Sequence, residues 1–303
     1  MQTPDYLLIG HMTRDLLPDG GFAPGGTALY AALTAHRLGR RVGVVSAQAT
    51  IPGDWDGGIE VAFVPTMETP VFENRYTPQG RVQTLHAVSS VLTIEHVPPA
   101  WRAARIVHLA PILAETPEPL VDAFPGALLG MTPQGLMRAW RAPLPARITY
   151  RPWTPSPRLL ERIDALIMSI EDLQFDEERA RAYARHCRLV ALTRGAAGAT
   201  LFLNGQPHHI EACPAIERDP TGAGDVFAAA LLVRLDETGD PLEAAHFAAC
   251  IAARSVEGVG PGAIPWRKEI DRCGVLQALC ERWVYRYARF SPPPRTRRCG
   301  RVG

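Results

Sequence analysis

Short apolar runs alternate with longer amphipathic stretches along most of this chain. The runs with the length and composition of buried strands are residues 6–10, 41–47, 105–109, 127–131, 163–168 and 189–193. Helical spacing is found between or after them, at residues 28–38, 117–124 and 171–186. Strands that alternate with helices predict a parallel sheet joined by right-handed crossovers. We therefore expect an α/β protein with a doubly wound, mainly parallel sheet.

The pattern changes after the turn-rich residues 51–58. Three strand-like runs follow, at residues 59–65, 71–76 and 81–88, and the turn at Thr77–Gly80 joins the last two into a hairpin. We expect this insert, about residues 59–90, to leave the main sheet and form a small β lid. Asn74 or Arg75 is expected to reach inward from it, but not both, because neighbouring strand residues face opposite ways.

Composition restricts the remaining possibilities. The chain of 303 residues is 47% hydrophobic and 21% charged, with a net charge of +1. This balance gives no field that would attract nucleic acid or a membrane surface, and no apolar run approaches the ~20 residues that span a bilayer. We expect one domain over residues 1–290 and a disordered tail, rich in Pro and Arg, over residues 291–303.

Two residue types exclude further classes of site. Lys268 is the only lysine, so the chain has no Gly-x-x-x-x-Gly-Lys phosphate loop. The six cysteines show no Cys-x-x-Cys spacing, which disfavours a zinc site and predicts free thiols in a cytoplasmic protein. His208 and His209 are neighbours in a strand-like run and face opposite ways, so they are expected to be solvated rather than to share a metal.

The loop from Asp219 to Asp225 carries the strongest chemical signal. Gly222, Ala223 and Gly224 permit a sharp turn, and the apolar run at residues 226–235 predicts that a buried helix begins there. The free N–H groups and the dipole of a helix start bind anions. A carboxylate beside them, Asp225, could accept a proton from an attacking hydroxyl, as a kinase requires. It could equally cap the helix.

The string Asp-Pro-Thr-Gly-Ala-Gly-Asp, followed by a Phe- and Ala-rich helix, resembles the C-terminal signature of the ribokinase-like (PfkB) carbohydrate kinases. The resemblance implies that Asp225 is the catalytic base and that the Gly222, Ala223 and Gly224 amides form the anion hole. It also implies a ribokinase-like fold with ATP as the phosphoryl donor and Mg²⁺ beside it.

The N-terminal region carries a second resemblance. Asp15 follows the first predicted strand, in a loop over residues 11–24, and is either solvated or placed at a ligand. Gly25-Gly26-Thr27 resembles the family's Gly-Gly motif, which implies that Asp15, Gly25, Gly26 and Thr27 bind the substrate. Many members have an Asn that contacts the sugar where this chain has Tyr30. We therefore expect this chain to bind its substrate differently from the way typical members bind ribose.

Partial matches add further candidates. Gln134 and Arg138 stand in a segment that resembles the family's Asp-x-Asn-x-Arg and are candidates for substrate and phosphate. Ser169 and Asp172, with Glu171 beside them, stand where the family has Asn-x-x-Glu, so Asp172 could hold Mg²⁺ through water. An N-cap Ser with acidic residues in the first helical turn explains the same three residues.

The nucleotide side is expected at two places. Thr193, Arg194, Gly195 and Gly198 form a turn that resembles the family's Thr-x-Gly-x-x-Gly, which borders the phosphates. The resemblance also implies cofactor contacts at Thr221 and at Gly260, which lies in a Gly-rich stretch that lines the adenine pocket of relatives.

These residues predict an ATP-dependent kinase acting on an alcohol group of a sugar, polyol or nucleoside, with a small molecule as its partner. The aromatic after Gly-Gly, the lid strand and the Gln134/Arg138 spacing are most similar to myo-inositol kinases. A homodimer through the lid is compatible with the family. The alternative is a sugar- or nucleotide-binding protein that keeps the fold without turnover, which the altered Asn-x-x-Glu region favours and the intact Asp225 loop disfavours.

Overall fold

The computed structural model describes residues 2–47, 58–77 and 80–272. The chain divides into two compact units, Met1–Arg267 and Lys268–Gly303. The second unit is described only as far as residue 272, within helix α6 (Arg267–Arg272). The predicted tail at residues 291–303 therefore lies outside the described residues, and everything below concerns the first unit.

A nine-stranded sheet forms the centre of the first unit, in the order β16-β15-β14-β13-β9-β8-β1-β4-β5. Its strands, in chain order, are β1 (Tyr6–Ile9), β4 (Val42–Ser46), β5 (Ile59–Phe63), β8 (Ile106–Leu109), β9 (Leu128–Met131), β13 (Ala165–Ser169), β14 (Leu189–Thr193), β15 (Ala199–Leu203) and β16 (Gln206–Ile210). All neighbours from β14 to β5 pair in parallel, and the β14-β15-β16 edge is antiparallel. The predicted α/β class with a mainly parallel sheet is confirmed.

Both faces of the main sheet are covered at its centre, which explains why the central strands β1, β4 and β8 are buried at every position. Gly130 of β9 faces α4, because a Cβ there would lie 2.4 Å from Leu232 of that helix. The opposite face packs on Trp101, Phe124 and Tyr183. The α-helices are α1 (Thr27–Arg37), α2 (Pro157–Arg162), α3 (Glu177–Tyr183), α4 (Ala223–Thr238) and α5 (Pro241–Ser255).

Short 3₁₀ helices fill several connections. They are η1 (Ile94–His96), η2 (Pro99–Ala103), η3 (Glu118–Ala123), η4 (Pro133–Met137), η5 (Gly195–Ala197) and η6 (Pro261–Ala263). Two predicted helices are thus shorter than expected. Residues 117–124 form only η3, and residues 171–186 contain only α3, since Gln174 and Phe175 adopt positive φ values of 53° and 63° that no α-helix can contain.

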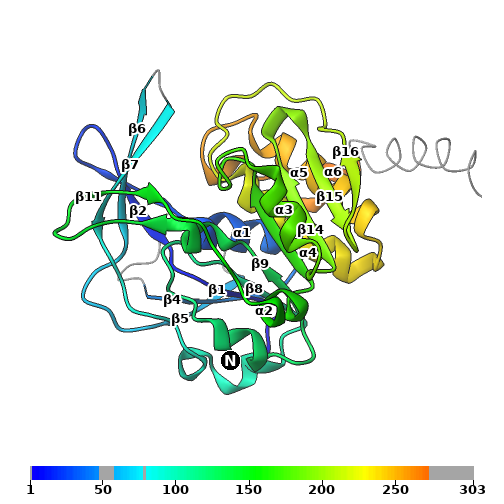
Figure 1. Ribbon diagram of the computed structural model, residues 1–303, viewed down its shortest axis with the longest axis horizontal. Coiled ribbons are helices and arrows are strands. Elements are labelled where there is room, and N and C mark those ends of the chain that lie inside the picture. Colours follow the sequence, from blue (N-terminus) through cyan, green and yellow to red (C-terminus); the bar gives the residue numbers. More distant parts are fainter. Residues whose placement is uncertain (1, 48–57, 78–79, 273–303) are drawn as a thin grey trace, which may run out of the picture. The chain divides into compact units, whose positions relative to one another are not determined.

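A second sheet of five strands, in the order β11-β7-β6-β2-β3, forms the lid (Figure 1). Its strands are β2 (Thr13–Leu16), β3 (Phe22–Gly25), β6 (Val71–Thr77), β7 (Gly80–Ala87) and β11 (Ala146–Arg147). A small separate pair consists of β10 (Arg138–Ala139) and β12 (Thr149–Tyr150).

The prediction for the lid was right for its hairpin and wrong for its borders. Residues 11–24, expected as a loop, contain β2 and β3, because β2 pairs in parallel with β6. Residues 59–63, expected in the lid, form β5 and continue the main sheet beside β4. The strand pattern alone could not assign a short run to one of two sheets, because the partner lies far along the chain.

The cysteines correct another expectation. Cys213 and Cys250 form a disulfide with a Cα–Cα distance of 5.1 Å, so the prediction of free thiols was wrong for these two. Cys187 is a buried free thiol, and the other three cysteines lie outside the described residues. Among the described helices, none is both long and apolar enough to cross a membrane.

Candidate active site

The loop of residues 219–225 starts α4, as the sequence predicts. Gly222 caps the helix with φ 78°, and a Cβ at this position would lie 2.2 Å from the Tyr30 ring. Only glycine fits both conditions. Tyr30 is 6% exposed and supports this loop with its ring, a role that differs from the substrate contact made by Asn in relatives. Of the three amides expected at the anion, that of Ala223 donates to Pro220 O at 3.2 Å.

Asp219 ties this loop to the stretch around Gly260. One carboxylate oxygen accepts the Thr221 N–H at 3.0 Å, and the other accepts the Gly260 N–H at 2.9 Å. The two residues expected at the nucleotide are therefore joined through one carboxylate, at the start of the anion loop.

Asp225 lies in the first turn of α4 and is partly exposed. Desolvation raises the pKa of its carboxyl to about 6, the hydrogen bond from the Thr27 side chain opposes this rise, and the negative charge of Asp172 adds to it. The positive charges of Arg138 and Arg81 act in the lowering direction. A carboxyl with this pKa is ionised at neutral pH and still basic enough to accept a proton.

Asp15 belongs to the same group of charges. Desolvation raises its pKa, while a hydrogen bond from Thr13 at 3.3 Å and the charges of Arg138 and Arg81 oppose the rise. Its carboxylate lies against Gly25, where a Cβ would be 2.9 Å from Oδ2. The expected closeness of Asp15 to the Gly-Gly turn is thus observed.

Gln134 and Asp172 meet at the carboxyl edge of the main sheet. Gln134 Nε2 donates to Asp172 Oδ1 at 3.1 Å, and Ser169 N–H donates to Asp172 Oδ2 at 2.9 Å. Both oxygens of Asp172 are thereby oriented. Gln134 therefore orients the Asp172 carboxylate in this structure, and its substrate contact stays a prediction.

Arg138 is a buried cation, 8% exposed, whose Nη1 donates to Ile112 O at 2.8 Å. Desolvation and the positive charge of Arg81 lower its pKa to about 10, against the raising effect of Asp172, Asp225 and Glu115. Its guanidinium lies 5.3 Å from the centre of the Phe72 ring on the lid strand β6. We name Asp15, Arg81, Arg138, Asp172 and Asp225 the Asp225 cluster.

The lid hairpin resolves the choice between Asn74 and Arg75. Phe72 contacts Arg138, and Asn74 shares its strand face, where it accepts a hydrogen bond from Gln83 at 2.8 Å. Arg75 lies on the other face and pairs with Glu73 at 2.6 Å. Asn74 is therefore the one on the cluster's side.

Arg81 was missed by the sequence reasoning. It lies on the same face of β7 as Gln83 and Leu85, and Leu85 is paired with Phe72 in the lid sheet. Its positive charge acts to lower the pKa values of Asp15, Arg138 and Asp225. The strand alternation could have placed Arg81 with Gln83, but nothing in the sequence says which face of the hairpin meets the site.

Glu115 was also missed. Its buried carboxylate accepts four backbone N–H groups, those of Ile112 and Leu113 at 2.8 Å, Ala114 at 3.1 Å and His11 at 3.2 Å. This carboxylate shapes the loop after β8, whose Ile112 carbonyl in turn holds Arg138. No local sequence signal marks such a residue, because the loop closes around it only in the fold.

The turn expected at the phosphates follows β14. Thr193 donates to Met168 O at 3.4 Å, and Gly198 has φ 81° with no room for a Cβ, which would lie 2.1 Å from Ile210 O. Arg194 forms an ion pair with Glu177 of α3 at 2.5 Å. This ion pair uses only Nη2, so the other N–H groups of Arg194 can still donate to a phosphate.

The described residues hold no cluster of three His, Cys, Asp or Glu side chains that could bind a metal by themselves. Asp172 still suits Mg²⁺, because Mg²⁺ retains water and is commonly bound by one or two carboxylates together with substrate phosphates. Its two oriented oxygens, close enough to Asp225 to raise that residue's pKa, are the observation that favours this fit.

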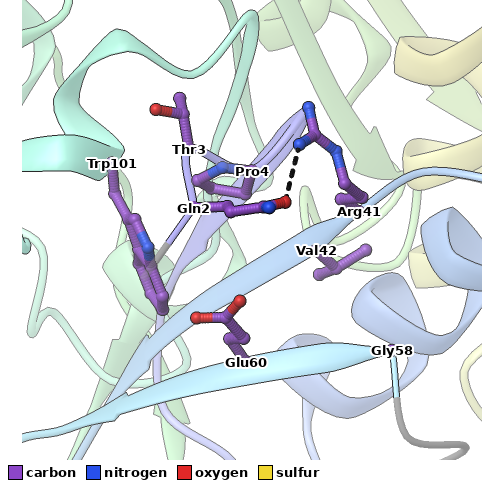
Figure 2. A pocket seen from close by; sticks show the side chains of 8 residues that line it. All are labelled: Gln2, Thr3, Pro4, Arg41, Val42, Gly58, Glu60 and Trp101. Carbon is purple, nitrogen blue, oxygen red and sulfur yellow. Dashed lines mark hydrogen bonds between the residues drawn. The ribbon is translucent and has the colours of Figure 1, made fainter.

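A hollow of about 200 Å³ opens at the amino ends of β1, β4 and β5 (Figure 2). It is lined by Gln2, Thr3, Pro4, Arg41, Val42, Gly58, Glu60 and Trp101. This is the end of the sheet opposite to Asp225, and it contains none of the residues that the motifs select.

Comparisons with known proteins bear on the family and on the fold. Residues 137–268 match the family model described as pfkB family carbohydrate kinase. The chain is similar to a pyrophosphate-dependent kinase in the ribokinase family, solved with a pyrophosphate analog and myo-inositol (TM-score 0.74, 24% identity, 88% of this chain and 99% of that chain). It is also similar to an Arabidopsis thaliana ribokinase complexed with ribose and ATP (TM-score 0.67, 20% identity, 91% and 99%). The fold is that of the ribokinase family, and residues 137–268 match the model of the pfkB carbohydrate kinases, the family that the sequence motifs resemble.

Curated relatives match over different lengths. A Klebsiella pneumoniae fructokinase is 33% identical over 38% of this chain and 42% of its own length. A Zea mays inositol 3-kinase is 39% identical over 35% of this chain and 28% of its own length. A Thermococcus kodakarensis cytidine kinase is 27% identical over 79% of this chain and 91% of its own length. The chain thus spans less than half of the fructokinase and of the inositol 3-kinase.

Proposed function

We propose that this protein is a kinase that transfers a phosphoryl group to an alcohol group of a sugar, polyol or nucleoside. The observation that carries the proposal is Asp225, whose carboxyl has a pKa of about 6 at the start of α4. This places a base and a helix-start anion site in one turn of the chain.

In the proposed reaction, the acceptor hydroxyl gives its proton to Asp225 while its oxygen attacks the terminal phosphorus of the donor. The new P–O bond forms as the bond to the leaving group breaks, which is ADP when ATP is the donor and phosphate when pyrophosphate is the donor. Asp225 then releases the proton to water. The Gly222 and Gly224 amides lie where they can face the negative charge of the transferred group.

The other members of the Asp225 cluster take supporting roles. Asp15, beside the Gly25-Gly26 turn, would accept hydrogen bonds from acceptor hydroxyls. Arg138 and Arg81 would face the transferred phosphoryl group, since the positive charge of each already acts to lower the pKa of Asp225. The lid would limit water, which competes with the acceptor for the phosphoryl group.

The donor proposed is ATP, with Asp172 holding Mg²⁺ through water. When bound, Mg²⁺ neutralises charge on the donor phosphates. Thr193, Gly195, Gly198, Thr221 and Gly260 are the proposed nucleotide contacts. Pyrophosphate is tested beside ATP, because the fold neighbour with a TM-score of 0.74 is described as pyrophosphate-dependent.

The acceptor proposed first is myo-inositol. Support comes from the inositol 3-kinase relative and from the fold neighbour solved with myo-inositol. Fructose and cytidine are the comparison acceptors, since a fructokinase and a cytidine kinase are also similar to this chain. A binding protein without turnover is the second candidate, favoured by the Ser169 to Asp172 segment that departs from Asn-x-x-Glu.

The test is a coupled assay of myo-inositol, fructose, ribose and cytidine, each with ATP and with pyrophosphate. We expect turnover with one donor and acceptor pair, its loss in Asp225→Asn, and normal rates in Asp122→Asn, a surface control. Donor binding without turnover on any acceptor would favour the binding protein. Full activity of Asp225→Asn would remove Asp225 from the reaction.

Two further expectations stay part of the proposal. A homodimer through the lid is suggested by the apolar side chains of Leu17 and Phe22, 39% and 45% exposed, near or on β2 and β3. Light scattering on the purified protein measures this state. A cytoplasmic location is proposed from the sequence alone.

A further inference from the structure

Three buried side chains form a hydrogen-bonded row that the proposed reaction does not use. Tyr6 Oη lies 2.7 Å from His108 Nδ1, and His108 Nε2 lies 3.1 Å from Thr132 Oγ1. Tyr6 and His108 are fully buried, and Thr132 is 7% exposed. The row therefore runs through the interior to Thr132, directly after the carboxyl end of β9.

The charge state of His108 determines which hydrogen bonds it can donate and accept in this row. Desolvation lowers its pKa to about 3, so its ring is neutral at any pH at which the protein works. A neutral imidazole has one N–H donor and one acceptor nitrogen. Its two neighbours are both hydroxyls, so one of them donates to the ring and the other accepts from it.

Only one arrangement of donors and acceptors along this row gives the Tyr6 and His108 protons an acceptor. If His108 donated to Tyr6, the phenol proton would need another acceptor, and within the described part of the chain Tyr6 Oη has no hydrogen bond other than that to His108. Tyr6 therefore donates to Nδ1, and Nε2–H donates to Thr132. The Thr132 hydroxyl must direct its own proton away from the ring.

Thr132 stands directly after β9, at the carboxyl edge of the main sheet. It shares a strand face with Gly130, which faces Leu232 of α4, and Asp225 lies two turns before Leu232 in that helix. Two residues further on, Gln134 holds Asp172. Burial and the negative charge of Asp225 both raise the pKa of Tyr6, which agrees with this placement of the row beside the cluster.

We propose that Thr132 donates a hydrogen bond to an oxygen of the acceptor alcohol, and that Tyr6 and His108 are positioning residues that hold its hydroxyl proton in that direction. The inference rests on the proposed kinase function. It names a specificity contact at a position where relatives of the Asp-x-Asn-x-Arg pattern carry a carboxylate, an acceptor rather than a donor.

The first test compares Thr132→Val with Thr132→Ser. The valine variant is expected to raise the KM of the acceptor about 3- to 10-fold, the range of one hydrogen bond, with the donor KM unchanged. The serine variant keeps the hydroxyl and should stay within about 2-fold of the parent. Thr116→Val is the matched control, since Thr116 is equally buried and its hydroxyl has no hydrogen-bond partner in the described structure.

The second test asks whether Tyr6 acts through Thr132. Tyr6→Phe lets the His108 proton move to Nδ1, so that Thr132 can donate to the ring instead of the acceptor. Tyr6→Phe made alone should raise the KM of the acceptor about 3-fold. Made in the Thr132→Val variant, it should leave the KM of the acceptor unchanged. Equal rises in both backgrounds, or a lower melting temperature alone, would reduce Tyr6 to a structural residue.

Binding without turnover separates this inference from the proposed function. The melting temperature is measured with myo-inositol, fructose, ribose and cytidine, without any donor. If none of them stabilises the parent and none is phosphorylated, the proposed function and the inference both fail. If one stabilises the parent and Thr132→Val binds it equally well, the inference alone is wrong.

Discussion

At the scale of single residues, Asp225 combines a chemical role with a cost to the fold. Its folded pKa of about 6 lies above the ordinary value of 3.8, so the native state binds a proton more tightly than the unfolded chain. The free energy of unfolding therefore falls as pH rises from about 4 to about 6, and the folded state carries this deficit at neutral pH.

Removing the charge should therefore stabilise the protein while it stops the reaction. Asp225→Asn is expected to lower kcat by roughly 10²- to 10⁴-fold, the range of general base catalysis. At pH 7.5 its melting temperature should rise by about 2–4 °C, for a gain on the order of 1 kcal/mol. Thermal melts at pH 7.5 and pH 4 check this, because the gain should shrink at the lower pH. An equal gain at both pH values would contradict the charge argument.

Thr27 should tune the same carboxyl. Its hydrogen bond acts to lower the pKa of Asp225, so Thr27→Val should raise that pKa. The acid limb of kcat/KM, expected near pH 6 in the parent, should move up by roughly 1 pH unit. Activity is lost as pH falls through this limb, because protonated Asp225 cannot accept the acceptor's proton. Thr27→Ser serves as the control, and an unmoved limb in the valine variant would assign the limb to another group.

At the scale of elements, the position of Asp225 depends on how closely α4 approaches β9. Gly130 has no side chain, and Leu232 occupies that space. Leu232 lies two turns along the helix from Asp225, so the contact sets the height of the helix over the sheet.

Gly130→Ala should disturb both stability and turnover. The new Cβ would lie 2.4 Å from Leu232, and the overpacking should cost about 1–3 kcal/mol and lower kcat as α4 shifts. Gly126→Ala, where a Cβ meets nothing within 4 Å, is the control for denaturant unfolding. Leu232→Ala should cost less in the Gly130→Ala background than alone; strict additivity would show that the helix does not move.

The central strands of the main sheet, such as β1, β4 and β8, could be predicted because each is buried on both faces. The lid strands β2 and β3 could not, since Thr13–Leu16 is short and mixed and its partner β6 lies far along the chain. The same limit applies to the site. Asp15, Asp225 and the glycines carry local motifs, whereas Arg81, Glu115 and the row from Tyr6 to Thr132 become recognisable only once strands and loops are brought together.

At the scale of the whole molecule, the Cys213–Cys250 bond encloses the anion loop and the whole of α4. The two cysteines are 37 residues apart. A cross-link over a loop of this length restricts the unfolded chain and is worth about 4 kcal/mol in the chain-entropy model.

Reduction should therefore lower the melting temperature. We expect protein purified without reductant to melt several degrees higher than the same protein with reductant, and Cys213→Ser to melt alike in both. Titration of free thiols under native and denaturing conditions reports the state of the pair. A full count of six thiols in the denatured, unreduced protein would show that the bond does not form in solution.

The Tyr30 ring packs against the backbone of Gly222. The helix after the N-terminal Gly-Gly motif therefore contacts the C-terminal motif that ends at Asp225. Gly222 stays glycine because of its positive φ, whereas position 30 can change with the acceptor. A relative that places a small polar side chain at position 30, to hold its acceptor, must fill the space beneath the loop from elsewhere. We expect position 30 to covary with the residues that fill this space, so that a change of acceptor leaves its mark on the residues that support the base.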